Sequence, residues 1–183
     1  MLTARRPVVD RPRMPDDAQL YELATRVGQR LLSTKRRVVF AESCTGGWIA
    51  KAITDVPDSS QWFECGYVTY SNAAKIRDLG VSQATLDTHG AVSEATVLEM
   101  ARGALRVSGA DIAVAVSGIA GPDGGVPGKP VGTVWFAIGS REGEDFVLKA
   151  SRQLFERDRE SVRRSAVEYA LEMILRLGLP RGQ

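Results

Sequence analysis

The chain has 183 residues, of which 44% are hydrophobic, 25% charged and 7% aromatic, and its formal net charge is +2. These totals are typical of a soluble globular protein with a sizeable core, and the small charge excludes a strongly basic nucleic-acid-binding class. The two cysteines, Cys44 and Cys65, have neither CxxC spacing nor secreted-scaffold density, and no signal pattern or membrane-length apolar run occurs. We therefore expect a cytoplasmic protein with reduced thiols and no membrane or nucleic-acid partner.

Residues 1–15 differ in composition from the rest of the chain. They are rich in Arg and Pro and show no hydrophobic periodicity, so we predict a flexible tail. Met14 is a candidate for the native start, which the intact mass of the native protein would decide. Residues 16–183 are predicted to form a single domain.

Beyond this tail, helical and strand-like patterns alternate along the chain. Cap residues mark several helix starts, namely Asp16 or Asp17, Ser71 or Asn72, Ser93, and Asp158. Helices are expected at residues 16–35, 45–54, 72–80 and 93–107 and after residue 158, with a turn at residues 89–90. Strands are expected at residues 38–41, 62–70, 111–118, 131–140 and 145–155.

This alternation, broken by one hairpin-like strand pair, predicts the fold class. It indicates an α/β protein, a single three-layer α/β/α sandwich with a mixed, mostly parallel sheet. Ligands of such sheets bind where the carboxyl ends of strands give way to loops. Three strands end in small polar or Gly-rich segments, at residues 41–47, 69–75 and 116–125, and we expect these loops to converge.

The first loop, residues 41–47, holds a candidate nucleophile, Ser43, at the end of a strand. The backbone N–H groups of residues 44–47 lie at a predicted helix start, where they could stabilise an oxyanion in acyl transfer. A second interpretation stays open, in which Ser43 or Thr45 caps the helix and the glycines only turn the chain.

The second loop supplies a candidate base for that serine. Ser needs a base to become a nucleophile, and the chain has a single histidine, His89, which is more typical of a turn or cap. Lys75 is the better candidate, provided that burial lowers its pKa. Asn72 lies on the same predicted helix face, and Tyr70 could orient or relay a proton. The alternative is an ordinary solvated lysine.

The third loop, residues 118–128, is dense in Gly and Pro. It has neither a Walker A pattern nor a G-x-G-x-x-G fingerprint, which disfavours nucleoside triphosphates and dinucleotides. Its glycines could free backbone amides for an anionic group, with Ser117 just before them. A surface turn held by Pro122 and Pro127 is the alternative.

Cys44 is a second nucleophile candidate beside Ser43. A helix N-terminus would favour its thiolate, but adjacent residues of a strand face different ways, so only one of the two can face the pocket. Packing in the core is the expected role of both cysteines. No His, Cys, Asp or Glu cluster has metal-ligand spacing.

Five linked motifs resemble one family over roughly residues 16–177. The chain is similar to the C-terminal domain of the competence-damage-inducible (CinA) family, and most of all to its stand-alone form, the nicotinamide-nucleotide amidases. The motifs are "AESCTGG", "GYVTYSNAAK", "HGAVSEATVLEMA", "VSGIAGPDGG" and "KPVGTVWFA".

The resemblance implies a metal-free, cofactor-independent serine–lysine amidase on a three-layer α/β/α fold. The implied reaction converts nicotinamide mononucleotide to nicotinate mononucleotide and ammonia, in pyridine nucleotide recycling. Ser43 falls on the nucleophile and Lys75 on its base. The motif positions that line the pocket are Thr45, Gly46, Gly47, Tyr70, Asn72, Ser117, Gly118 and Gly121.

One departure from the family pattern precedes the last helix. The family's F-x-G-D-R is FERDR here, with Arg157 in place of the usual Gly, whereas Asp158 and Arg159 keep their places. If Arg159 helps to bind the substrate phosphate, the bulkier neighbour could shift the loop that carries it, so Arg159 ranks below Ser43 and Lys75 as a site residue.

The remaining roles are hypotheses that compete with others. Glu42 could face the pyridinium of the substrate or be a buried structural acid, and the Ser117 hydroxyl could assist the oxyanion.

Three rival functions are a cysteine hydrolase that uses Cys44, a non-catalytic nucleotide-binding member of the family, and a DNA-repair or competence partner. A homodimer is the expected assembly.

Overall fold

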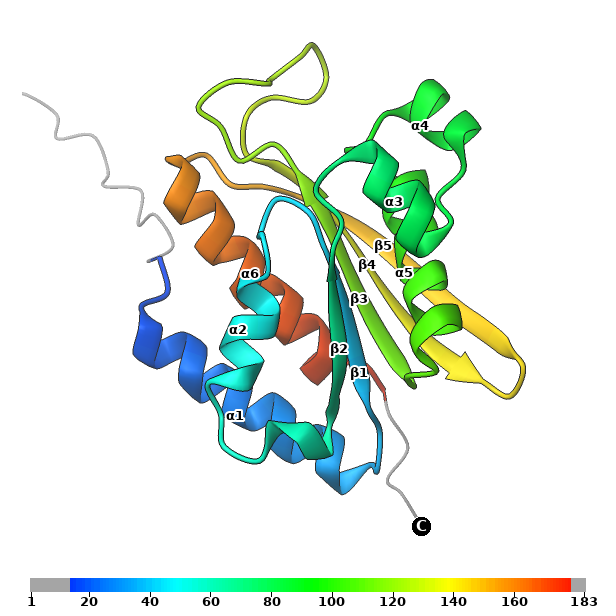
Figure 1. The fold of residues 1–183 in the computed structure, drawn as a ribbon. Coiled ribbons are helices and arrows are strands. Elements are labelled where there is room, and N and C mark those ends of the chain that lie inside the picture. Colours follow the sequence, from blue (N-terminus) through cyan, green and yellow to red (C-terminus); the bar gives the residue numbers. More distant parts are fainter. Residues whose placement is uncertain (1–13, 179–183) are drawn as a thin grey trace, which may run out of the picture.

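A single five-stranded sheet lies between two layers of helices (Figure 1). The computed structural model describes residues 14–178. Almost all of the predicted tail therefore lies outside the described residues, as do residues 179–183. None of the helices within 14–178 combines the length and apolar composition needed to cross a membrane.

One face of the sheet carries α1, α2 and α6, and the other carries α3, α4 and α5 (Figure 1). The helices are α1 (Asp17–Ser33), α2 (Trp48–Thr54), α3 (Asn72–Leu79), α4 (Gln83–His89), α5 (Glu94–Ser108) and α6 (Arg159–Arg176), with a short 3-10 helix at Ser59–Gln61. The two helical layers enclose two separate apolar clusters, one on each face of the sheet. The predicted three-layer α/β/α architecture is confirmed.

The strand order is β2-β1-β3-β4-β5. The strands are β1 (Val38–Glu42), β2 (Phe63–Val68), β3 (Ile112–Gly118), β4 (Thr133–Glu142) and β5 (Asp145–Leu154). β1 pairs in parallel with both β2 and β3, whereas β4 is antiparallel to β3 and to β5. Four of the five strands thus run in one direction, and the carboxyl ends of β1, β2 and β3 meet at one edge.

Strand β1 lies inside the sheet, between β2 and β3, and is buried on both faces. Its side chains alternate between the two layers: Val38 and Phe40 join the cluster under α1, α2 and α6, and Val39 and Ala41 join the cluster under α5. This period of two is intrinsic to strand geometry. The same alternation decides where the residues just after β1 point.

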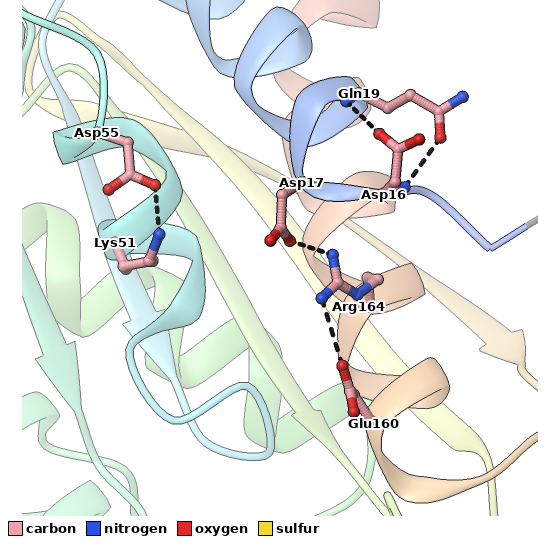
Figure 2. Close-up of polar contacts among 7 residues, drawn as sticks. All are labelled: Asp16, Asp17, Gln19, Lys51, Asp55, Glu160 and Arg164. Carbon is pink, nitrogen blue, oxygen red and sulfur yellow. Dashed lines mark hydrogen bonds and ion pairs between the residues drawn. The ribbon is translucent and has the colours of Figure 1, made fainter.

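The predicted caps are observed at α1, α3, α5 and α6. Asp16, Ser71, Ser93 and Asp158 each accept a hydrogen bond from a backbone N–H in the first turn of the helix. At α1, Gln19 completes a capping box with Asp16 (Figure 2). α1 and α6 pack side by side, and Arg164 of α6 is paired with Asp17 of α1 across them (Figure 2).

Two helix predictions need correction. α2 begins at Trp48 and not at residue 45, because Gly46 and Gly47 have φ of +63° and +91°, which a right-handed helix does not accommodate. Residues 83–89 form α4, where only a turn at residues 89–90 was predicted. Leu86 is the only buried residue of this seven-residue helix, so it has no apolar stripe to reveal it.

Candidate active site

The three loops predicted to converge do meet at the carboxyl edge of the sheet. The first and second are joined by the Lys75 Nζ to Ser43 Oγ hydrogen bond of 3.0 Å. Arg159 links the second and third, because its guanidinium donates to the Tyr70 hydroxyl and to the Gly121 carbonyl. These contacts bring residues 43, 70, 75 and 121 together at one edge of the sheet.

Ser43 and Lys75 form a buried pair. The Lys75 amine has no exposed surface, and besides Ser43 it donates to the carbonyl oxygens of Thr69 at 2.7 Å and Tyr70 at 3.4 Å. None of these three partners is a carboxylate, and burial lowers the pKa of Lys75 to about 8. A substantial fraction of the amine is therefore neutral near physiological pH, as a general base for Ser43 requires.

Ser43, rather than Cys44, faces the lysine. Ser43 continues the row of Val39 and Ala41 toward the α3–α5 layer, whereas Cys44 packs in the cluster under α1, α2 and α6. Burial raises the pKa of the Cys44 thiol to about 12, far from a usable thiolate at neutral pH. These observations favour the expected packing role of Cys44.

Glu42 is a buried carboxylate that holds the start of α2. One oxygen accepts from the Thr45 hydroxyl at 2.6 Å and from the N–H groups of Gly47 and Ile49, and the other accepts from the Ala50 N–H at 2.8 Å. A carboxylate at a helix N-terminus is stabilised by these unpaired donors and by the helix dipole. The geometry favours the structural role of Glu42 over contact with a substrate pyridinium.

The same contacts correct the predicted oxyanion site. The N–H of Gly47 is taken up by Glu42, and the N–H of Gly46 donates to the Ser43 carbonyl at 3.1 Å. The Thr45 hydroxyl is likewise occupied by Glu42. Of the predicted N–H groups of residues 44–47, those of Cys44 and Thr45 have no acceptor in the described part of the chain.

Ser117 and Gly118 have local structural partners. The Ser117 hydroxyl is buried and donates to the Ala91 carbonyl at 2.7 Å, so its proton is not directed at an oxyanion. Gly118 pairs with Val134, and a Cβ at Gly118 would lie 2.7 Å from the Val134 side chain. Close packing of β3 on β4 explains this glycine without a ligand.

Arg159 and Tyr70 form the rim of the site. Tyr70 is 60% exposed, and its hydroxyl accepts from the Arg159 guanidinium at 3.2 Å and is not among the hydrogen-bond partners described for Lys75. The Lys75 amine contacts the carbonyl of Tyr70 instead. Asn72 is the exposed first residue of α3, one turn before Lys75. Their roles toward a substrate stay predictions.

The third loop is tied down on two sides. Gly121, with φ of +87°, presents its carbonyl to Arg159 at 2.7 Å, and Lys129 donates to the carbonyl of His89 at 2.7 Å. Residues 122–128 are exposed, and Val126 and Lys129 form a bridge that closes a turn. This outer part matches the surface-turn alternative, and anion binding by its glycines stays a prediction.

Arg157 does not disturb the start of α6. Its φ is not in the left-handed region, so this backbone does not require the family's usual Gly. Asp158 still caps the helix through Ser161, and Arg159 still reaches Gly121 and Tyr70. These contacts keep Arg159 at the rim of the site, and its role toward a substrate phosphate stays a prediction.

Other candidates lie outside this pair. His89 is the exposed last residue of α4, and its backbone carbonyl accepts a hydrogen bond from the side-chain amine of Lys129. Within residues 14–178 no group of three or more His, Cys, Asp or Glu side chains could hold a metal ion.

Sequence reasoning missed Arg163. This residue of α6 donates from Nε to the Cys44 carbonyl at 3.1 Å and from a terminal nitrogen to the Thr45 carbonyl at 2.8 Å. The two hydrogen bonds join residues that are 119 and 118 positions apart in the sequence, so no local motif could have indicated them. The only sequence signal is its place one turn after the Asp158 cap.

Comparisons with known proteins identify the family of the chain. The sequence model of the CinA C-terminal domain matches residues 20–177. Two curated relatives are named nicotinamide-nucleotide amidohydrolase PncC. The Escherichia coli K12 protein is 54% identical over 158 residues, covering 86% of this chain and 94% of its own length. The Pseudomonas putida protein is 56% identical over 156 residues, covering 85% and 95%.

A solved structure has the same fold. The competence damage-inducible protein A (ComA) from Klebsiella pneumoniae superposes with a TM-score of 0.82 at 44% sequence identity. The match covers 86% of this chain and 96% of that chain. The shared fold therefore extends over most of both chains.

Proposed function

The chain belongs to the CinA C-terminal domain family, and we propose that it is a nicotinamide-nucleotide amidohydrolase. The proposed reaction converts nicotinamide mononucleotide and water to nicotinate mononucleotide and ammonia. Curated relatives with that activity in their names, at 54% and 56% identity, support the assignment. The observation that carries it is the buried hydrogen bond of 3.0 Å between Lys75 Nζ and Ser43 Oγ.

In the first step, Ser43 Oγ attacks the carbon of the substrate carboxamide. The neutral Lys75 amine takes the hydroxyl proton as the new C–O bond forms, and the carbonyl electron pair moves to the oxygen. A base with a pKa of about 8 is available for this role near neutral pH. The tetrahedral intermediate carries a negative oxygen that needs hydrogen-bond donors.

In the second step, the intermediate collapses and the C–N bond breaks. The Lys75 ammonium returns its proton to the leaving nitrogen, so that ammonia departs and an acyl-Ser43 ester remains. Water then attacks the ester while Lys75 takes a proton from it. The bond between the acyl carbon and Ser43 Oγ breaks, the Lys75 ammonium returns the proton to Oγ, and nicotinate mononucleotide leaves. These reaction steps are written without a cofactor or metal, because the Lys75 amine takes and returns each proton.

The substrate phosphate is assigned to the rim. Arg159 is exposed, lies between the second and third loops, and has a guanidinium suited to bidentate phosphate contacts. Tyr70 and Asn72, exposed beside it, are proposed to contact the rest of the nucleotide. Glu42 has no such role in this proposal, because its carboxylate is occupied by α2.

Ammonia release is the direct test. Purified protein is incubated with nicotinamide mononucleotide or with plain nicotinamide, with Ser43→Ala and Lys75→Ala as matched controls. Release from the nucleotide alone, and loss of release in both variants, is the expected result. If the nucleotide raises the Tm but no ammonia appears, the non-catalytic nucleotide-binding alternative holds instead.

Assembly and location complete the proposal. Both cysteines are free thiols, which supports a cytoplasmic protein in pyridine nucleotide recycling. A homodimer is proposed from the prevalence of two-fold assemblies, and sedimentation velocity at micromolar concentration tests it. A single species at the monomer mass would overturn the dimer.

A further inference from the structure

Arg163 holds the loop that follows the proposed nucleophile. Its guanidinium donates to two successive carbonyl oxygens, those of Cys44 and Thr45, from one half-buried side chain. Gly46 leaves room for it, since a Cβ there would lie 3.3 Å from the guanidinium nitrogen. The φ of +63° at Gly46 also favours glycine, so both the backbone conformation and the nearby guanidinium suit a residue without a side chain here.

The two carbonyl contacts fix the direction of the N–H groups in the same two peptide units, those of Thr45 and Gly46. The peptide bond between Cys44 and Thr45 is trans, because the only cis bond among the described residues lies between Gly121 and Pro122. In a planar trans peptide the C=O and N–H point in opposite directions. The Thr45 N–H therefore points away from Arg163 when the Cys44 carbonyl points toward it.

The Thr45 N–H is also available. The next two N–H groups donate to the Ser43 carbonyl and to the Glu42 carboxylate, whereas the Thr45 N–H has no acceptor in residues 14–178. It lies two residues after Ser43, in the loop between the nucleophile and α2. A backbone donor in such a loop is the usual source of oxyanion stabilisation in acyl transfer.

We propose that Arg163 is a positioning residue that aims the Thr45 N–H at the carboxamide oxygen in the tetrahedral intermediate. This inference rests on the proposed function, because it names a further residue for the same reaction. The guanidinium does not touch the substrate. It acts by holding two peptide planes, which requires both of its donor nitrogens.

Arg164 supplies the matched control. The guanidinium groups of Arg163 and Arg164 both lie over the Trp48 ring, at 5.2 and 4.9 Å from its centre. Arg164 is paired with Asp17 and Glu160 instead of with the loop carbonyls (Figure 2). Replacing it disturbs the same helix and the same aromatic contact but leaves the Cys44 and Thr45 carbonyls bound.

The test compares Arg163→Lys with Arg164→Lys in the full-length protein. Lysine keeps the charge but cannot bind two carbonyls in a fork. For nicotinamide mononucleotide we expect kcat to fall about 10- to 100-fold in Arg163→Lys, with KM within about threefold, because a misaimed donor loses transition-state stabilisation. Arg164→Lys should keep kcat within about twofold. The Tm of both variants is measured alongside.

A second readout does not depend on the natural substrate. A fluorophosphonate phosphonylates an activated serine: Ser43 Oγ bonds to phosphorus, fluoride leaves, and the serine proton passes to Lys75. The rate of the mass increase at Ser43 should fall about 10-fold or more in Arg163→Lys, and within about twofold in Arg164→Lys, since the phosphoryl oxygen needs the same donor.

The outcomes separate the two proposals. If wild-type protein reacts at Ser43 but releases no ammonia from the nucleotide, the proposed function fails and the Arg163 inference is decided by the labelling rates. Equal losses in both arginine variants, or no loss in either, would overturn the positioning role. A wild-type Ser43 that neither reacts nor turns over would overturn both.

Discussion

Glu42 and Arg163 hold the loop after β1 through opposite hydrogen-bonding groups, an acceptor and a donor. The carboxylate of Glu42 accepts from N–H groups at the start of α2, and the guanidinium of Arg163 donates to the carbonyls of Cys44 and Thr45. Between them, Ser43 projects to the opposite layer and meets Lys75. A serine held at a backbone of fixed orientation is the arrangement that acyl transfer requires.

Ser43 and Cys44 are expected to respond differently to removal of their side-chain functions. Ser43→Ala should lower ammonia release by about a thousandfold or more, because no nucleophile remains beside Lys75. Cys44→Ala should keep the rate within a few-fold and lower the free energy of unfolding by about 1 kcal/mol, since a small buried group is lost. The reverse pattern in steady-state rates would restore the cysteine hydrolase.

The rate should rise with pH through the pKa of Lys75. The amine is a base only when neutral, and its pKa is about 8, so kcat/KM should increase roughly tenfold per pH unit below pH 7 and level off above about pH 8.5. A pH profile of ammonia release measures this. A flat profile between pH 6 and 9 would contradict the lysine base.

The lowered pKa of Lys75 should also make the free energy of unfolding depend on pH. The folded pKa of Lys75 lies below its ordinary 10.5, so the unfolded state binds more protons between about pH 8 and 10.5 and the wild type gains stability there. The stability of Lys75→Met relative to wild type should therefore drop by up to about 3 kcal/mol from pH 8 to pH 10.5. Urea unfolding at both pH values tests this, and a constant difference would refute it.

Glu42→Gln tests the structural role of that acid. The amide would put an NH₂ group against backbone donors that now share a carboxylate, so we expect a loss of about 2 to 4 kcal/mol in the free energy of unfolding. Glu160→Gln, which removes an exposed acid at the start of α6, should change it by less than about 0.5 kcal/mol. An unchanged stability with a raised KM in Glu42→Gln would instead support contact with the substrate.

Arg159→Ala should distinguish a phosphate site from a loop anchor. Loss of a charged donor to phosphate is expected to raise KM for nicotinamide mononucleotide about 10- to 100-fold. Turnover of nicotinamide riboside, which has no phosphate, should stay within a few-fold. If both substrates suffer equally, Arg159 serves only to hold Tyr70 and Gly121 in place.

The sequence predicted most of the fold because the fold depends on local signals. Buried strands, cap residues such as Asp158, and hydrophobic periodicity gave the layers and the candidate pair. α4 was missed because a helix with one buried residue, Leu86, has no pattern to detect. The pairing of Ser43 with Lys75 was predictable, since both follow strands whose carboxyl ends share an edge.

The finer chemistry of the site was not predictable in the same way. Which N–H groups remain available depends on where the Glu42 carboxylate and the Arg163 guanidinium settle, and both choices arise from packing of α2 and α6 on the sheet. A sequence pattern places four amides near one spot. Only three-dimensional contacts assign two of them to other partners.

The sandwich separates two halves of a reaction into different layers. The amine that moves protons comes from α3, while the side chains that orient the loop come from the strand end and α6 on the far side of the sheet. Damage to one layer can therefore leave the other intact. A protein with a loosened α6 layer would still deprotonate Ser43, but it would stabilise the negative charge of the intermediate less well. Two classes of defective enzyme, told apart by which stage of a single turnover slows, should map onto opposite faces of the same five strands.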